Sequence, residues 1–357
     1  MKIAMLISGG VDSSVALRLL KDQGHEITAF YLKIWLEDEL SFLGDCPWEE
    51  DLAFVRAVCK QADISLQVIP LQKEYKDTII AYTIDQVKRG LTPNPDMLCN
   101  TFIKFGAFYD AVGKDFDAVA TGHYARVICK NNVYYLGQTP DLVKDQSYFL
   151  ARLSQEQLSH SIFPLGEYTK EQVRALAQKY DLPNKDRKDS QGLCFLGKIS
   201  FRDFIKAHVG IKKGDLCVYE TGEKIGEHDG FWFYTLGQRQ GLGLSGGPWY
   251  VVKKDIIANV VFISNEYYAP NKERNSFVLQ DVVWNTVMPH DDVYVKIRHG
   301  QYMHKAMVQQ EGLYYRVFLQ EHDQAIAPGQ FAVFYQDGLC IGSGVIVYSR
   351  NENTMGF

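Results

Sequence analysis

The N-terminal part of the chain alternates between short apolar runs and longer stretches with apolar side chains at helical spacing. The short runs cover residues 2–7, 27–32 and 65–69, and each has the length of one buried strand. Residues 50–62 and 73–88 between and after them show the helical spacing. Strands that alternate with helices form parallel sheets, so we expect an α/β domain with a doubly wound parallel sheet.

A glycine turn separates the first strand from the first helix. Ser8, Gly9 and Gly10 break the apolar run, because paired glycines permit a tight turn, and Asp12 and Ser13 then open a helix. The free N–H groups and the positive end of the helix dipole favour a bound anion there. The turn has neither the lysine of G-x-x-x-x-G-K-[ST] nor the spacing of G-x-G-x-x-G.

The pattern changes after about Gly197. Residues 215–264 form short runs rich in Gly, Tyr and Trp, which predict a small β domain. Residues 293–297 and 331–335 alternate with period two, which predicts a second small barrel or sandwich. We therefore expect an α/β catalytic domain at 1–197, a central β domain at 198–273, a C-terminal β-barrel at 274–350 and a tail at 351–357.

Composition narrows the class of protein. No apolar run is long enough to cross a membrane, and the chain enters a strand at once, so neither a membrane span nor a signal peptide is expected. Seven cysteines without a C-x-x-C pair favour reduced thiols in the cytoplasm and no metal site. The net charge of −5 argues weakly against nucleic acid, although a local basic face would suffice. Basic pairs such as Lys253-Lys254 are interpreted as solvated surface.

Cys99 and Cys194 differ from the other cysteines in context, because each lies in a polar stretch with an aspartate nearby. Pro93 and Pro95 enforce an extended approach, and a helix can begin near Asp96. Cys99 would then lie in the first helical turn, facing the same way as Asp96, where the dipole lowers the pKa of a thiol. The cysteines in predicted helices or strands are interpreted as small buried apolar residues, namely Cys59, Cys129, Cys217 and Cys340.

The turn at residues 8–14 resembles the pyrophosphate loop of the ATP-pyrophosphatase superfamily, whose members cleave ATP between the α- and β-phosphates and adenylate a carbonyl oxygen. Such a loop together with two separated cysteines suggests sulfur transfer. One cysteine would carry a persulfide, and the other would complete the exchange by thiolate attack on the sulfur–sulfur bond.

Six strings in the same order along the chain resemble the tRNA-specific 2-thiouridylase family (MnmA/TrmU type). The resemblance runs from the first strand to Gly344. The strings are residues 92–100, 120–124, 144–149, 188–195, 226–230 and 235–243.

This resemblance implies a transferase that uses ATP, with Mg²⁺, to convert the wobble uridine of tRNA into 2-thiouridine, releasing AMP and pyrophosphate. It implies Cys99 as the nucleophile, Cys194 as the persulfide carrier and Asp96 as the general acid or base. A disulfide between the two cysteines would be a resting or product state. Asn94, Pro95 and Asp96 are expected to hold the target base.

The resemblance also implies the remaining contacts. Its expected partners are the anticodon stem-loop of tRNA and a sulfur-donor protein, with the chain acting as a monomer. The family often has Met in place of Leu32 and a further Arg in place of Gly300, so this chain departs from the pattern at both positions. The implied nucleotide contacts are Leu6, Ile7, Ser8, Gly9, Gly10, Val11, Asp12, Ser13, Leu32 and Gly122. The implied tRNA contacts are His123, Lys144, Asp145, Gln146, Arg298, His299 and Gln330.

Two other functions fit part of the pattern. A ligase of the same superfamily would adenylate a carboxylate and form an amide, but it needs an ammonia source and leaves Cys99 and Cys194 unused. A nucleotide-binding RNA module without turnover would not need Asp12, Asp96 or the two cysteines.

Overall fold

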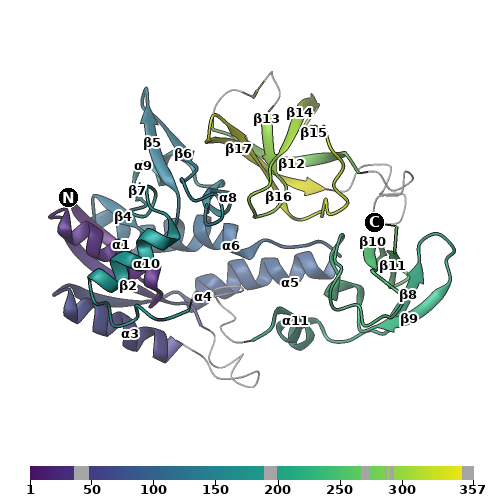
Figure 1. Ribbon diagram of the computed structural model, residues 1–357, viewed down its shortest axis with the longest axis horizontal. Coiled ribbons are helices and arrows are strands. Elements are labelled where there is room, and N and C mark those ends of the chain that lie inside the picture. Colours follow the sequence, from purple (N-terminus) through teal and green to yellow (C-terminus); the bar gives the residue numbers. More distant parts are fainter. Residues whose placement is uncertain (36–47, 189–198, 267–273, 286–287, 290–292, 348–357) are drawn as a thin grey trace.

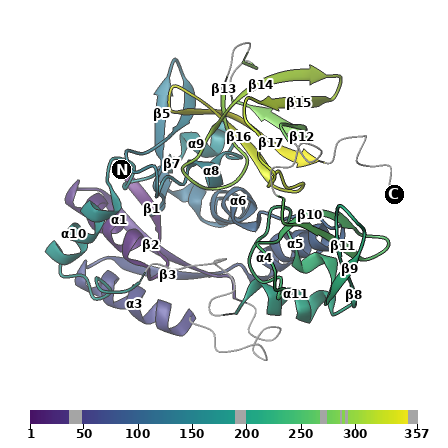
Figure 2. The ribbon, with the colours of Figure 1, turned by 45° about the vertical axis from the view of Figure 1, so that its right-hand side comes forward.

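The computed structural model describes residues 1–35, 48–188, 199–266, 274–285, 288–289 and 293–347. An α/β region comes first in the chain, and two β regions lie side by side at one end of it (Figures 1 and 2). Among the described residues, none of the helices has both the length and the apolar character needed to span a bilayer.

The N-terminal sheet has five parallel strands in the order β3-β2-β1-β4-β7. The two faces of β1 belong to different hydrophobic clusters, since Ile3 and Met5 pack on one side and Ala4 and Leu6 on the other. The predicted doubly wound parallel sheet is therefore confirmed. Its strands are β1 (Lys2–Leu6), β2 (Glu26–Lys33), β3 (Ser65–Pro70), β4 (Ala118–Ala120) and β7 (Ser161–Ile162).

Helices cover both faces of this sheet. One face carries α1 (Val11–Asp22), α3 (Trp48–Gln61) and α10 (Lys170–Lys179). The other face carries two longer helical stretches that each include a π-helical part. They are α4 (Gln72–Tyr75), η2 (Lys76–Ile80) and α5 (Ala81–Lys88), and then α6 (Pro95–Leu98), η3 (Cys99–Ala107) and α7 (Phe108–Ala111).

Short elements complete this region. Capping boxes at Ser154 and Thr169 begin α9 (Gln155–Ser159) and α10. A hairpin is formed by β5 (Arg126–Lys130) and β6 (Val133–Gly137). Cys129 is exposed rather than buried, because β5 is the edge strand of its sheet. The remaining short helices are η4 (Gly113–Asp115), α8 (Ser147–Leu150) and α9 (Gln155–Ser159).

The central region is a four-stranded sheet in the order β10-β11-β8-β9 with its own apolar cluster. Lys254 does not lie on solvated surface as predicted. Its Nζ donates to the carbonyl oxygens of Gly90 (2.6 Å) and Tyr234 (2.9 Å). The elements are α11 (Phe201–Val209), β8 (Gly214–Val218), β9 (Lys224–His228), η5 (Phe231–Phe233), β10 (Tyr250–Asp255) and β11 (Val260–Ser264).

The C-terminal region is a closed barrel, which settles the choice between barrel and sandwich. Its strands follow the order β12-β15-β14-β13-β16-β17, and β17 pairs back with β12. The hairpin of the α/β region extends it, since β6 pairs with β17. The strands are β12 (Ser276–Trp284), β13 (Val293–Lys296), β14 (His304–Glu311), β15 (Tyr314–Leu319), β16 (Phe331–Gln336) and β17 (Leu339–Val347).

Candidate functional site

The glycine turn after β1 is held closed by hydroxyl groups. Ser13 Oγ accepts from the Ser8 N–H (3.2 Å) and donates to the Gly10 carbonyl (3.1 Å). Gly10 caps α1 without any side-chain hydrogen bond to the first turn. Gly9 has φ +78°, and a Cβ there would lie 2.7 Å from the Asp51 carbonyl oxygen. The turn thus presents backbone N–H groups at a helix N-terminus, which suits a phosphate.

Gly122 lies directly against this turn, at the end of β4. A Cβ at Gly122 would come within 2.7 Å of the backbone nitrogen and Cα of Ser13. A glycine is therefore required for the strand end to approach the first turn of α1. Leu32 lies near the end of β2, and it packs partly buried against the core. The side chains of Leu6, Ile7 and Val11 are buried, so these residues can offer a ligand only backbone groups.

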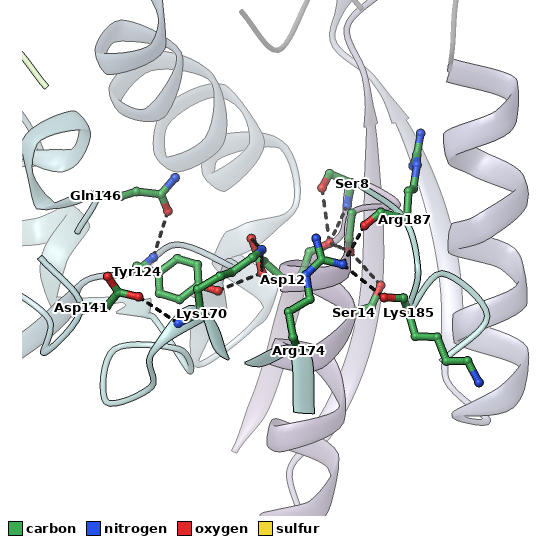
Figure 3. Close-up of polar contacts among 12 residues, drawn as sticks. Ser8, Asp12, Ser14, Tyr124, Asp141, Gln146, Lys170, Arg174, Lys185 and Arg187 are labelled. Carbon is green, nitrogen blue, oxygen red and sulfur yellow. Dashed lines mark hydrogen bonds and ion pairs between the residues drawn. The ribbon is translucent and has the colours of Figure 1, made fainter. Parts of the chain in front are cut away.

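A lysine that sequence reasoning missed supplies a cation to the turn (Figure 3). Lys170 Nζ lies 2.7 and 2.9 Å from the two carboxylate oxygens of Asp12. Tyr124 also donates its hydroxyl to Asp12, over 2.9 Å. The Lys170 N–H is fixed by the Asp141 carboxylate (2.9 Å). A lysine at the first position of α10 is unfavourable beside the positive end of the helix dipole. This unfavourable position is the feature of the sequence that could have pointed to a role for Lys170.

Asn184 and Arg187 join the turn from the other side. Both donate to the Gly9 carbonyl oxygen, over 2.8 and 3.1 Å. Arg187 also forms an ion pair with Asp51 of α3. Burial raises the pKa of Asp51, and the neighbouring Arg187 partly offsets this effect. Arg174 donates to the Arg187 carbonyl (2.7 Å), so several hydrogen bonds hold the segment 184–187 beside the glycine turn.

Cys194 lies at 189–198, outside the described residues, and so does Asp189. Of the described residues close to this stretch, one before it lies at the glycine turn and one after it lies in the hydrophobic cluster of Cys99. Arg187 contacts the glycine turn, and Ile199 belongs to the same hydrophobic cluster as Cys99. The predicted disulfide and the persulfide role of Cys194 stay predictions.

The helix that carries Cys99 begins as predicted, with Asn94 as its cap and Pro95 as its first residue. Asn94 Oδ1 accepts from the Met97 N–H over 3.3 Å. Asp96 is half-buried in the first turn. Cys99 is 1% exposed and follows that turn rather than lying in it, so the dipole acts on it less than expected.

The loop predicted to contact tRNA directs two of its side chains inward. Asp145 forms a buried ion pair with Lys296 of the barrel, with Nζ and Oδ2 3.0 Å apart. Gln146 Oε1 accepts from the Tyr124 N–H (3.0 Å). His299 Nε2 donates to the Asp145 carbonyl (3.3 Å), and burial lowers the pKa of its imidazole. Lys144 precedes these buried groups and is half-buried.

The other predicted tRNA contacts are also engaged within the protein. His123 Nδ1 lies 2.7 Å from Thr121 Oγ1, and burial holds the pKa of His123 well below its ordinary value. Arg298 Nη2 donates to Asp323 Oδ2 (2.7 Å). Burial alone would raise the pKa of Asp323, but hydrogen bonds from His304 and Arg298 hold it below its usual range.

Gln330 turns towards the Cys99 helix. Its Nε2 donates to the carbonyl oxygens of Thr92 (3.1 Å) and Pro93 (2.9 Å). The structure thus places the glycine turn, Gly122 and Lys170 together, and it ties the barrel to the segment before Cys99. Whether these groups bind nucleotide, target base or tRNA stays a prediction.

Three family models match the chain in succession. A tRNA methyl transferase HUP domain matches residues 1–198, a tRNA methyl transferase PRC-barrel domain matches residues 202–265, and an aminomethyltransferase beta-barrel domain matches residues 274–346. The order of these domains agrees with the three regions of the fold.

Full-length relatives are similar over nearly the whole chain. The tRNA-specific 2-thiouridylase MnmA 1 of Bacteroides thetaiotaomicron is 46% identical over 355 residues, which cover 97% of this chain and 99% of the relative. The tRNA-specific 2-thiouridylase MnmA of Parabacteroides distasonis is 44% identical, with coverages of 97% and 99%. That of Porphyromonas gingivalis is 44% identical, with coverages of 98% and 100%. The chain therefore belongs to the tRNA-specific 2-thiouridylase family.

Proposed function

We propose that this protein is a tRNA-uridine 2-sulfurtransferase, which replaces oxygen 2 of the wobble uridine by sulfur in an ATP-dependent reaction. The observation that carries the proposal is identity of 43 to 46% to thiouridylases along almost the entire chain. Amide formation is not favoured, because the relatives described above are named tRNA-specific 2-thiouridylases and amide formation would leave Cys99 without a role.

The residues around the glycine turn fit the triphosphate of ATP. The Ser8 N–H and the Ser13 hydroxyl hold the turn in shape, the first N–H groups of α1 would donate hydrogen bonds to a phosphate, and Lys170 adds a positive charge. Asp12 accepts two bonds from Lys170, and with Mg²⁺ present its carboxylate would help to hold the ion beside the phosphates. When bound, ATP supplies the adenylyl group that makes oxygen 2 of uracil a leaving group.

The thiol chemistry is assigned to the two cysteines. The persulfide on Cys194 supplies the sulfur atom, and the reaction ends with Cys99 and Cys194 joined as a disulfide that an external thiol reduces. Asp96, one helical turn before Cys99, is the general acid or base. The burial of Cys99 keeps its sulfur away from bulk water and from adventitious oxidants.

The uridine is turned out of the anticodon stack to reach this site, since a base cannot be modified within a stack. Asn94, Pro95 and Asp96 hold the flipped base. Several of the residues assigned to tRNA binding also form hydrogen bonds or ion pairs within the protein, so they hold the tRNA-binding surface in shape as well as contacting tRNA. The assigned residues are His123, Lys144, Asp145, Gln146, Arg298, His299 and Gln330. The chain works as a monomer and receives sulfur from a persulfide-bearing protein.

Incubation with labelled ATP, a persulfide donor and unmodified tRNA tests the proposal. We expect AMP, pyrophosphate and 2-thiouridine in equal amounts, and none of the three without tRNA. ATP cleavage that depends on a small carboxylic acid and ammonia, with no thionucleoside, would contradict it.

A further inference from the structure

The connection from α5 to α6, residues 89–94, is the place where the three regions of the molecule meet. It runs below the barrel and reaches the central β region (Figure 1). The central region holds it at Gly90, whose carbonyl accepts from Lys254 Nζ (2.6 Å). The barrel holds it at Thr92, whose N–H donates to the Pro328 carbonyl (2.8 Å).

Gln330 of the barrel makes two polar contacts to this connection. Its side-chain amide has two N–H groups, and its Nε2 donates to the carbonyl oxygens of Thr92 and Pro93, over 3.1 and 2.9 Å. These two carbonyl oxygens precede the helix that carries Cys99. Gln330 therefore contacts the backbone just before the cap of that helix.

The backbone of Gln330 is held by two hydrogen bonds within the barrel. Its carbonyl accepts from the Ile346 N–H (2.9 Å), and its N–H donates to the Ala327 carbonyl (3.1 Å). The preceding residue, Gly329, has φ +92°, and a Cβ there would lie 2.8 Å from the Thr92 carbonyl oxygen. The barrel turn thus sits directly on the connection, and a displaced turn would displace the connection with it.

A second bond from the same barrel strand reaches the helix cap. The Tyr148 hydroxyl donates to the Phe331 carbonyl (3.0 Å), and Tyr148 lies near the side chain of Asn94. Asn94 in turn accepts from the Met97 N–H. Barrel residue 330 therefore holds the carbonyls before the cap, and barrel residue 331 holds the tyrosine that lies beside the cap.

We infer that Gln330 is a positioning residue, which orients the first turn of α6 and so places Asp96 and Cys99 for reaction. The inference rests on the proposed function for the identity of the reaction. It differs from a direct tRNA contact in its consequence. A contact to tRNA contributes to affinity, whereas a misplaced reactive group lowers the rate after tRNA is bound, by roughly 100-fold for a shift of about 1 Å.

The test uses Gln330→Met, which keeps the length of the side chain and removes both donors. We expect the single-turnover thiolation rate at saturating tRNA to fall by at least about tenfold. This loss of rate at saturating tRNA should exceed any change in the Kd for tRNA. Ser343→Ala is the matched control, because Ser343 Oγ donates to the Ala151 carbonyl (3.2 Å) across the same boundary without contacting residues 89–94.

A wild-type rate in Gln330→Met at saturating tRNA would overturn the inference, whatever the Kd, and so would an equal loss in Ser343→Ala. Hydrogen exchange at the Met97 N–H gives a readout without catalysis, and we expect faster exchange in Gln330→Met only. If wild-type protein makes no thiouridine, the proposed function fails while this exchange still decides the positioning role. If thermal unfolding shows that Gln330→Met does not fold, Gln330→Glu is used in its place, because an ionised glutamate also lacks the two N–H donors.

Discussion

At the scale of single residues, the glycine turn was predictable and its partners were not. Residues 8–14 carry a local pattern, and the contacts within them span only a few positions. Lys170 reaches Asp12 across 158 positions of the chain, and Arg187 reaches Gly9 across 178. No period or spacing relates such residues, because only the folded sheet brings them together.

The cation at the turn leads to a prediction for ATP use. Lys170→Met should lower the rate of ATP cleavage by about 10- to 100-fold, because one charge-assisted hydrogen bond is worth about 1.5–3 kcal/mol. The measurement is release of labelled pyrophosphate over a range of ATP concentrations. Lys185→Met is the control, since Lys185 lies nearby and pairs with the exposed Asp181. Equal rates in Lys170→Met and wild type would show that Lys170 serves only to pair with Asp12.

At the scale of elements, the sequence predicted strands and helices well but left their partners open. Period two in residues 331–335 fits a barrel and a sandwich alike, and only the pairing of β12 with β17 closes the barrel. The two-residue pairing of β17 with β6 joins elements about 200 residues apart and has no signal in either strand. Lys254 looked like surface because its partners are backbone oxygens, which a sequence cannot show.

The contact of Lys254 at the end of α5 predicts a pH dependence of stability. Burial lowers the pKa of Lys254 to about 8, from 10.5. Between these values the unfolded chain holds a proton that the folded protein has released, so this lysine makes folding more favourable as pH rises. Relative to Lys254→Met, wild type should gain about 1–3 kcal/mol in free energy of unfolding between pH 8 and pH 10.

Urea unfolding of both proteins at several pH values measures this difference, and other titrating groups cancel between them. If the difference in free energy of unfolding between wild type and Lys254→Met stays constant or falls from pH 8 to pH 10, the folded protein does not disfavour the charged form of Lys254.

At the scale of the whole molecule, the barrel and the α/β region share a buried ion pair. Asp145 and Lys296 are 3.0 Å apart and both are almost fully buried. Asp145 also accepts from Ser147 Oγ (2.8 Å), whose oxygen lies 3.0 Å from the Tyr335 hydroxyl. The predicted tRNA loop is thereby fastened to the barrel, so the two regions present one continuous surface.

Removal of one charge of this pair should destabilise the protein more than removal of both. Lys296→Met leaves a buried carboxylate without its partner and should cost about 3–5 kcal/mol in free energy of unfolding. The double variant Asp145→Asn/Lys296→Met should recover a large part of that loss. Chemical unfolding of the two variants and wild type gives the comparison, and equal losses in both variants would contradict a role for the charge pair.

The central claim is that sulfur passes from Cys194 to the wobble uridine of tRNA at a site that includes Cys99. The most direct measurement follows radioactive sulfur from a persulfide donor, through the protein, into nucleosides digested from tRNA. We expect label on Cys194 before ATP is added and in 2-thiouridine afterwards, with Cys194→Ser still cleaving ATP but transferring no label. Transfer of label to the uridine by Cys194→Ser at the wild-type rate would contradict the account.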